Sequence, residues 1–212
     1  MSQPSQTVVG IDVGGRVKGF HAVALRNGTF QETTSTDPAE IVNWCCKQNA
    51  TVIAVDAPCR WSQSGASRLA ERALEVAGAK IHCFSTPTRA RALAHEAGFY
   101  DWVLNGEKLY ARLVRHYPLF DGKRRKGPVC FETFPHAIVR ALAGKVIPAK
   151  PKASVRRDVL RKLGYDHSPL PNIDFVDAAL CAVAAEDFRK GCWQRFGDRN
   201  EGFIVVPAPS HE

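Results

Sequence analysis

Short apolar runs separated by turn residues fill the first 35 residues of the chain. They occupy residues 7–13, 19–25 and 29–34. The last two flank Asn27-Gly28, a strong hairpin signal, so the pattern predicts a three-stranded antiparallel meander. A helix should follow as far as about residue 48, because Asp37 can cap it and Pro38 suits its first position.

Two later runs are apolar without alternation. Residues 51–55 and 129–132 therefore indicate strands buried on both faces, as in a parallel sheet covered by helices. A short apolar segment at 80–84 and a last strand at 202–206 are also expected. Further helices are expected at residues 66–76, 90–96, 106–116, 135–143, 154–163 and 172–188. The pattern predicts an α/β fold, a mixed sheet flanked by helices, with a mainly helical insertion at about 60–127.

The composition favours a single folded domain spanning residues 1–212, since hydrophobic residues make up 45% and charged residues 24% of the chain. No run approaches the ~18 apolar residues of a membrane span, and the first residues lack the features of a signal peptide. The seven cysteines form no C-x-x-C pair, and several lie in apolar runs, which favours buried reduced thiols. We therefore expect a cytoplasmic protein without a disulfide scaffold, a structural zinc site or a membrane partner.

Positive charge is concentrated in the middle of the chain. The formal net charge is +8, but residues 108–162 alone hold 15 basic and three acidic residues, so the remainder is acidic. A well-solvated basic surface would explain this distribution. A surface that binds nucleic acid or another polyanion would explain it equally well, so charge alone leaves both open.

Three of the expected strands end in a carboxylate. Asp12 closes the first run, Asp56 follows the run at 51–55, and Glu132 ends the run at 129–132. Ligands of open α/β sheets bind at the carboxyl ends of parallel strands, which lie ~4.8 Å apart. Carboxylates that close repel one another unless protons or cations intervene, and a pair of Mg²⁺ or Mn²⁺ ions would serve. Each acid alone could instead cap a helix or make an Asx turn, so the hypothesis depends on all three together.

The last expected helix adds two more acids. Asp177 falls on its apolar stripe, between Ile173 and Leu180, whereas Asp174 lies one turn earlier on the adjoining flank. Interaction with the helix dipole explains Asp174 well, because it lies in the first turn. An acid that faces the core needs a partner, and a metal ion at the strand ends would be one for Asp177.

Four segments together resemble a known family. GIDVGG, AVDAP, FETFP and IDFVDAALCAVAA are similar to segments of the DUF429 family, described as predicted nucleases with a ribonuclease H-like fold. The resemblance covers residues 8 to about 188. It implies a ribonuclease H-like mixed sheet and a metal-dependent nuclease, which hydrolyses phosphodiester bonds at a two-metal carboxylate site with Mg²⁺ or Mn²⁺.

The same resemblance assigns roles to individual residues. The implied catalytic residues are Asp12, Asp56, Glu132 and Asp177, and the implied metal ligands are Asp12, Asp56, Asp174 and Asp177. The implied partner is nucleic acid. Its phosphates would be held, with little sequence reading, by Lys123, Arg124, Arg125, Lys126, Lys152, Arg156 and Arg157. Whether the protein forms a homodimer is left open.

Other interpretations remain. A non-catalytic ribonuclease H-like binding domain would have acids too far apart to share a metal, or acids occupied by Arg or Lys. The segment 12–15, Asp-Val-Gly-Gly, also resembles the first phosphate loop of actin-like and sugar-kinase proteins, although the chain is too short for their two lobes. The dispersed histidines lack metal-type spacing and are interpreted as surface or packing residues. They are His21, His82, His95, His116, His136 and His167.

Overall fold

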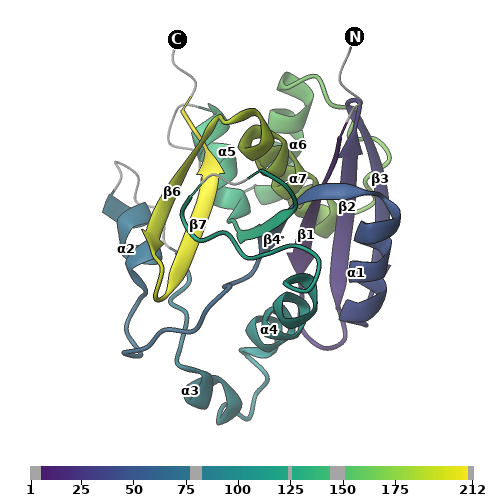
Figure 1. The fold of residues 1–212 in the computed structure, drawn as a ribbon. Coiled ribbons are helices and arrows are strands. Elements are labelled where there is room, and N and C mark those ends of the chain that lie inside the picture. The colour runs from purple at the N-terminus through teal and green to yellow at the C-terminus, as the bar shows by residue number, and fades with distance from the viewer. Residues whose placement is uncertain (1–5, 77–82, 124–125, 144–150, 210–212) are drawn as a thin grey trace.

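Seven strands form one mixed sheet within the part of the chain that the computed structural model describes, residues 6–76, 83–123, 126–143 and 151–209. They are β1 (Thr7–Val13), β2 (Phe20–Arg26), β3 (Thr29–Ser35), β4 (Ala50–Asp56), β5 (Val129–Glu132), β6 (Trp193–Asp198) and β7 (Gly202–Pro207). Their order across the sheet is β3-β2-β1-β4-β5-β7-β6 (Figure 1).

The pairing of the strands confirms the main sequence predictions. β1, β2 and β3 pair antiparallel as a meander. β4 lies parallel to β1 and β5 parallel to β4, as the two uninterrupted apolar runs predicted. β7 lies parallel to β5, and β6 pairs antiparallel with β7 at the edge of the sheet. β6 was not predicted, because its residues WQRFGD show no strict alternation of apolar and polar side chains.

Seven helices lie within the described residues: α1 (Pro38–Lys47), α2 (Leu69–Val76), α3 (Arg89–Leu93), α4 (Asp101–Leu113), α5 (Pro135–Ala143), α6 (Lys152–Lys162) and α7 (Ile173–Lys190). α1 begins where predicted, because the Asp37 carboxylate accepts a hydrogen bond of 2.8 Å from the Ala39 amide. α5 has the predicted bounds, whereas α4 begins at Asp101, ahead of the expected residue 106. Most of the expected segment at 80–84 lies outside the described residues.

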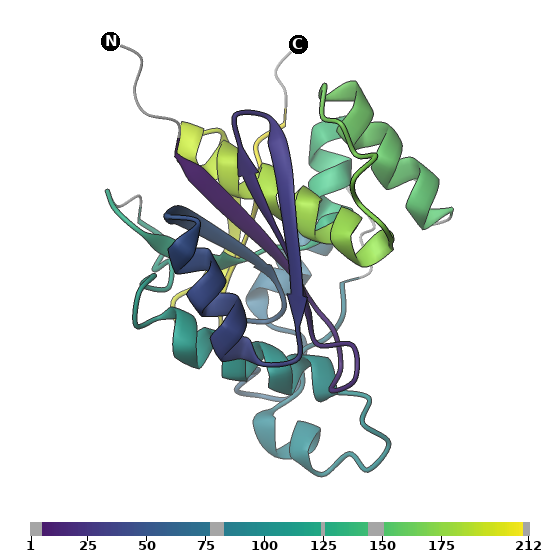
Figure 2. The same cartoon turned by 90° about the vertical axis from the view of Figure 1, so that its right-hand side faces the viewer.

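Helices cover both faces of the sheet. α7 crosses one face, and α1 and α4 pack against the other (Figures 1 and 2). Alternate residues of β1 therefore enter different cores: Val8 packs in the cluster that contains α7, and Val9 and Ile11 pack with α1 and α4. This explains why β1 is buried along its whole length and why its sequence reads as a continuous apolar run.

A glycine permits the close packing of α7 on the sheet. A Cβ atom at Gly10 would lie 2.0 Å from the Ala178 carbonyl oxygen and 2.2 Å from the Ala182 amide nitrogen. No side chain can be accommodated between two backbones at that distance. The contact holds α7 directly over β1 and thereby brings the first turn of the helix next to the end of that strand.

The region in which a helical insertion was predicted contains α2, α3 and α4, joined by long segments without regular structure. α2 packs beside β6 and β7, whereas α4 packs against α1 (Figure 1). The region therefore contacts the sheet at two separate places. The ends of β4 and β5 lie between them.

The state of the cysteines and the character of the helices can be compared with what the sequence predicted. All seven cysteines are free, and Cys45, Cys130 and Cys181 are buried, as predicted for reduced thiols in apolar runs. None of the helices in the described ranges has the length and apolar character that a membrane crossing requires.

Candidate metal centre at the strand ends

Asp12 and Asp56 are direct neighbours in the sheet. They are register partners on the parallel strands β1 and β4, so their side chains leave the same face, the one covered by α7. Asp12 is 9% exposed, and Asp56 is partly exposed. No described residue donates a hydrogen bond to either carboxylate. The sequence analysis predicted that these two acids share a site, and the structure brings them together.

Burial makes both carboxylates hold their protons more tightly than usual. It raises the pKa of Asp12 to about 6, and the charge of Asp174 acts in the same direction. The pKa of Asp56 is raised well above its usual value, first by burial and then by the charge of Asp12. Lys152 and Arg156 lower both pKa values but do not offset the effect of burial. The pair therefore carries a negative charge that the surrounding protein compensates only in part.

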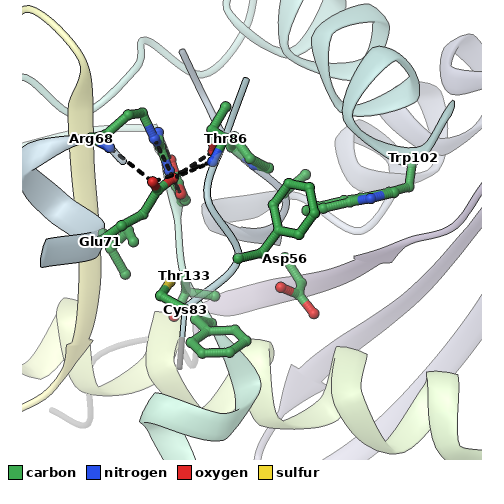
Figure 3. A pocket seen from close by; sticks show the side chains of 13 residues that line it. Asp56, Arg68, Glu71, Cys83, Thr86, Trp102 and Thr133 are labelled. Atoms are coloured by element: carbon green, nitrogen blue, oxygen red, sulfur yellow. Dashed lines mark hydrogen bonds and ion pairs between the residues drawn. The ribbon is translucent and has the colours of Figure 1, made fainter. Parts of the chain in front are cut away.

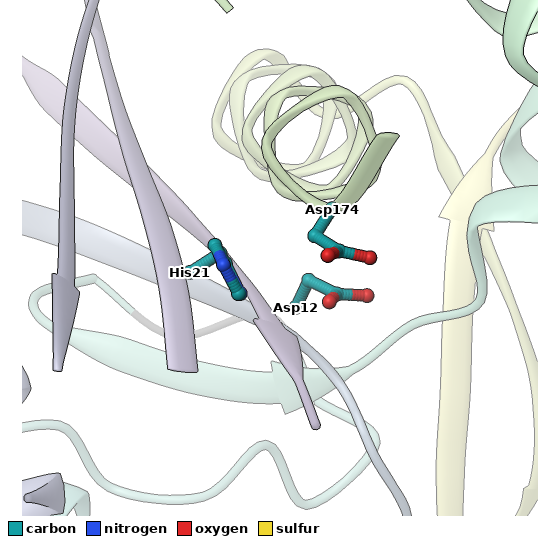
Figure 4. Close-up of side chains that lie close together, drawn as sticks. All are labelled: Asp12, His21 and Asp174. Atoms are coloured by element: carbon teal, nitrogen blue, oxygen red, sulfur yellow. The ribbon is translucent and has the colours of Figure 1, made fainter. Parts of the chain in front are cut away.

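His21 and Asp174 complete a cluster around Asp12. The ligand atoms of Asp12, His21 and Asp174 all lie within 4.8 Å of one another (Figure 4). His21 is the register partner of Asp12 on β2, and Asp174 projects from the first turn of α7. His21 is 8% exposed, and its ring meets Phe175 edge-on at 4.8 Å between centroids. Three elements that are distant in sequence therefore supply two carboxylates and an imidazole to one point.

One nitrogen of the His21 ring has no protein partner among the described residues. This atom is Nδ1, and it is buried. Burial lowers the pKa of His21, so the ring is neutral at pH 7 and offers a lone pair. A buried polar atom without a partner destabilises a protein unless something satisfies it. The sequence analysis interpreted His21 as a surface or packing residue and missed this cluster. The antiparallel pairing of the first two strands was the signal that could have placed it opposite Asp12.

Both carboxylate oxygens of Asp177 are paired with basic side chains. It is 2% exposed and accepts a hydrogen bond from the Arg156 guanidinium, while the Lys152 ammonium lies 3.0 Å from its other oxygen. Asp174 in turn pairs with Lys18, whose Nζ atom lies 2.5 Å from its carboxylate. The partner expected for Asp177 is thus supplied by α6, and Asp174 is the helix acid that approaches Asp12. The role of Asp177 as a metal ligand stays a prediction, and a metal there would have to displace these cations.

Comparison with protein families identifies the chain. A family model described as "Protein of unknown function (DUF429)" matches residues 10–202. The chain belongs to the DUF429 family. Neither the curated proteins nor the solved structures contain a match to it. The DUF429 match includes every residue of the cluster, together with Asp56, Glu132 and Asp177.

Glu132 faces away from the cluster in this DUF429 protein. It pairs in register with Val55, not Asp56, so its side chain emerges on the opposite face of the sheet. There it receives hydrogen bonds from Arg68, at 2.9 and 2.5 Å, and from the Cys59 amide at 2.8 Å. The Glu132 side chain is 5% exposed and the Arg68 side chain 1% exposed. Glu132 thus anchors the segment that leads into α2, although its charge still contributes to the raised pKa of Asp56.

The residues expected to bind phosphate are distributed over the molecule. Lys152 lies next to the acids and its side chain is 52% exposed. Arg156 is buried against Asp177, and Arg157 donates to the carbonyls of His167 and Leu170 at 3.1 and 2.8 Å. Lys123 and Lys126 are exposed but precede β5, so they lie at the end of that strand opposite to Glu132. Arg124 and Arg125 lie outside the described residues.

The donor set suits a hard divalent cation. Carboxylate oxygens are the preferred ligands of Mg²⁺ and Mn²⁺, and an imidazole nitrogen is accepted by Mn²⁺ more readily than by Mg²⁺. The unpartnered Nδ1 of His21 and the incompletely compensated charge of Asp12 and Asp56 both favour a bound cation. The site of this DUF429 protein therefore fits Mn²⁺ better than Mg²⁺.

Proposed function

We propose that this protein is a metal-dependent phosphodiester hydrolase that acts on nucleic acid, with Asp12 at the centre of its site. The observation that supports this most strongly is the position of Asp12 between two sets of ligands. Asp56 lies beside it in register on β4, and His21 and Asp174 lie within 4.8 Å on its other side. An antiparallel meander followed by the parallel strands β4 and β5, with acids on the first and fourth strands, also favours the ribonuclease H-like assignment.

The ligands divide into two groups that share Asp12. His21 and Asp174 would hold one divalent cation together with Asp12, and Asp56 would hold a second one with it. Cations bound there would stabilise the charge that develops during in-line displacement at phosphorus and make an attacking water more acidic. The protein itself holds the three carboxylates at fixed positions on β1, β4 and α7. It also excludes water from most of the surface of Asp12 and His21.

Two lysines beside the site are suited to contact phosphate oxygens. The side chains of Lys18 and Lys152 are 51% and 52% exposed, and they pair with Asp174 and Asp177. Both lysine side chains are about half exposed, so they can also contact a phosphate from solvent, whereas their partners Asp174 and Asp177 are mostly shielded from it. Binding of substrate and cation would then release Asp174 for the metal. Arg156, which is buried, stays with Asp177.

One observation favours the alternative of a non-catalytic binding domain. Asp174 and Asp177 are already paired with Lys18, Lys152 and Arg156, which is the occupation by cations expected for a site that has lost its metals. The kinase-like alternative has less support, because the Gly14 amide donates to the Gly19 carbonyl at 2.7 Å and is not free for a phosphate.

Cleavage of labelled nucleic acids tests the proposal. Single-stranded, duplex, hybrid and branched substrates should be incubated with Mn²⁺ or Mg²⁺ and with wild type, Asp12→Asn, Asp56→Asn and Asp158→Asn. Asparagine preserves the shape of the side chain and removes its charge, and the exposed Asp158 serves as the matched control. We expect cation-dependent cleavage that is lost in the first two variants and retained in the third. Equal cleavage by wild type and Asp12→Asn would contradict the proposal, and no cleavage of any substrate would favour the binding domain.

A further inference from the structure

A narrow cavity opens next to Asp56, on the side away from His21 and Asp174. It holds about 340 Å³ of space, the solvent at its open mouth included, and is lined by residues from six separate segments of the chain. Figure 3 shows the Asp56 carboxylate at one side of it and Trp102 above. Because Asp56 belongs both to the cavity and to the acid pair, a molecule bound at the acids has direct access to this space.

Three of the residues that line the cavity are aromatic. Phe84 comes from the segment before α3, Trp102 from the first turn of α4 and Phe134 from the residue pair after β5. The rings of Phe84 and Trp102 meet edge-on at 4.9 Å between centroids. All three side chains are partly exposed and also pack against the neighbouring core clusters. Three partly exposed rings around one hollow are suited to contact a planar apolar face.

The polar groups on the floor of the cavity are engaged with one another. The Thr86 hydroxyl donates to Glu71 at 2.5 Å, and Arg68 donates to Glu71 at 2.7 Å and to Glu132 (Figure 3). The Thr133 hydroxyl donates to the Val205 carbonyl at 2.7 Å. These groups rigidify the floor and leave few donors or acceptors to read the edge of a ligand. An occupant would therefore be held by its flat face and not by a pattern of hydrogen bonds.

We propose that this cavity receives an unstacked nucleobase of the strand whose phosphodiester lies at the acid pair. The inference rests on the proposed function, because it takes the phosphate to be bound beside Asp56. A base joined to that phosphate through its sugar reaches only the immediate surroundings, and this cavity, which Asp56 lines, is an apolar space within them. Stacking without edge recognition tolerates all bases, so the site discriminates by strand structure. Unpaired nucleotides enter, whereas paired bases would first have to leave the duplex.

The inference predicts how binding depends on the base and on Trp102. Stacking of one base on an aromatic side chain corresponds to roughly a 5- to 100-fold difference in affinity. Affinity should be measured with Ca²⁺ in place of Mn²⁺, using fluorescein-labelled single strands that differ only in one abasic position, and the corresponding duplex. Wild type should bind the intact single strand more tightly than the abasic strand or the duplex, by roughly this 5- to 100-fold factor. Trp102→Ala should lose the difference, and Trp102→Phe should retain most of it. Trp44→Phe, on α1 and outside the cavity lining, should leave it unchanged.

The outcomes separate this inference from the proposed function. Equal binding of intact and abasic strands by wild type, or an unchanged preference in Trp102→Ala, would overturn the cavity assignment even if the protein cleaves nucleic acid. Absence of binding to every strand, together with absence of cleavage, would overturn both. Full competition by a free nucleoside monophosphate would support the cavity and identify nucleotides as sufficient ligands. Mn²⁺ binding that is retained in Trp102→Ala would show that this variant is folded and that its acid pair is intact.

Discussion

Asp12→Asn should stabilise the metal-free protein, because the fold holds the Asp12 carboxylate where its charge is unfavourable. The side chain is 9% exposed, and burial raises its pKa from 3.8 to about 6. A carboxyl group with a raised pKa binds its proton more tightly in the folded than in the unfolded state. The free energy of unfolding therefore falls as the pH rises from about 4 to about 6. An asparagine at this position has no charge to bury, so the free energy of unfolding of the variant does not fall in this way as the pH rises.

The size of the effect follows from the shift. A change of about two pKa units, at about 1.4 kcal/mol per unit, corresponds to on the order of 3 kcal/mol. The difference between Asp12→Asn and wild type should be small near pH 4, where the carboxyl is protonated in both states. It should grow through the window from about 4 to 6 and reach its full value at pH 7. Such a gain is a large fraction of the net stability of a domain.

Urea unfolding followed by circular dichroism measures this difference in stability. The titrations are made in EDTA at several pH values from 4.5 to 7.5, a range of about three units around the raised pKa. Asp158→Asn is the control, since Asp158 is 52% exposed in an ion pair with Arg161 and should change stability little at any pH. A variant that is less stable than wild type at pH 7.5, about 1.5 units above the raised pKa, would refute the reasoning. A difference that does not depend on pH would refute it as well. Mn²⁺ should then raise the stability of wild type and leave Asp12→Asn unchanged, because only the former binds it.

Three further substitutions test other parts of the account. Gly10→Ala places a methyl group 2.0 Å from the α7 backbone and should lower the free energy of unfolding by about 3 kcal/mol or more in urea titrations. Arg68→Met leaves the buried Glu132 carboxylate without the guanidinium that pairs with it and should lower the free energy of unfolding by about 3–5 kcal/mol. Lys18→Met removes the ammonium group that pairs with Asp174 and should tighten Mn²⁺ binding measured by calorimetry, whereas weaker binding would contradict the proposed ligand set.

Local signals were sufficient to predict most of the helices and strands. The turn at Asn27-Gly28 lies between β2 and β3, and the two positive-φ residues that it requires are both present. Asn172 caps α7 through its side chain, which accepts hydrogen bonds from the Asp174 and Phe175 amides at 2.9 and 3.2 Å. Each of these features depends on residues that are adjacent in the chain. The positions of Asp12 and Asp56 followed because both end buried strands that are neighbours in the sheet.

The rest of the site depends on register and on distant partners. Glu132 lies one residue out of register with Asp56, and that single step moves its side chain to the other face. His21 lies opposite Asp12 only because the loop between β1 and β2 closes with a hydrogen bond from Gly14 to Gly19. The cation beside Asp177 comes from α6, and no sequence spacing specifies that contact. Positions of this kind are set by tertiary packing and cannot be derived from periodicity.

Direct measurement of Mn²⁺ binding is the most decisive test of the account. The titration with Mn²⁺ is made near pH 7.5, about 1.5 units above the raised pKa of Asp12, and free Mn²⁺ is followed by electron paramagnetic resonance. It compares wild type with Asp12→Asn, His21→Ala and the exposed control His116→Ala. We expect binding by wild type and by His116→Ala and loss of binding in Asp12→Asn. His21→Ala should weaken binding by at least about tenfold, because loss of even a residue that only supports a metal ligand costs about that much. Binding of Mn²⁺ by Asp12→Asn with wild-type affinity, or no binding by wild type, would contradict the assignment of a metal centre at Asp12.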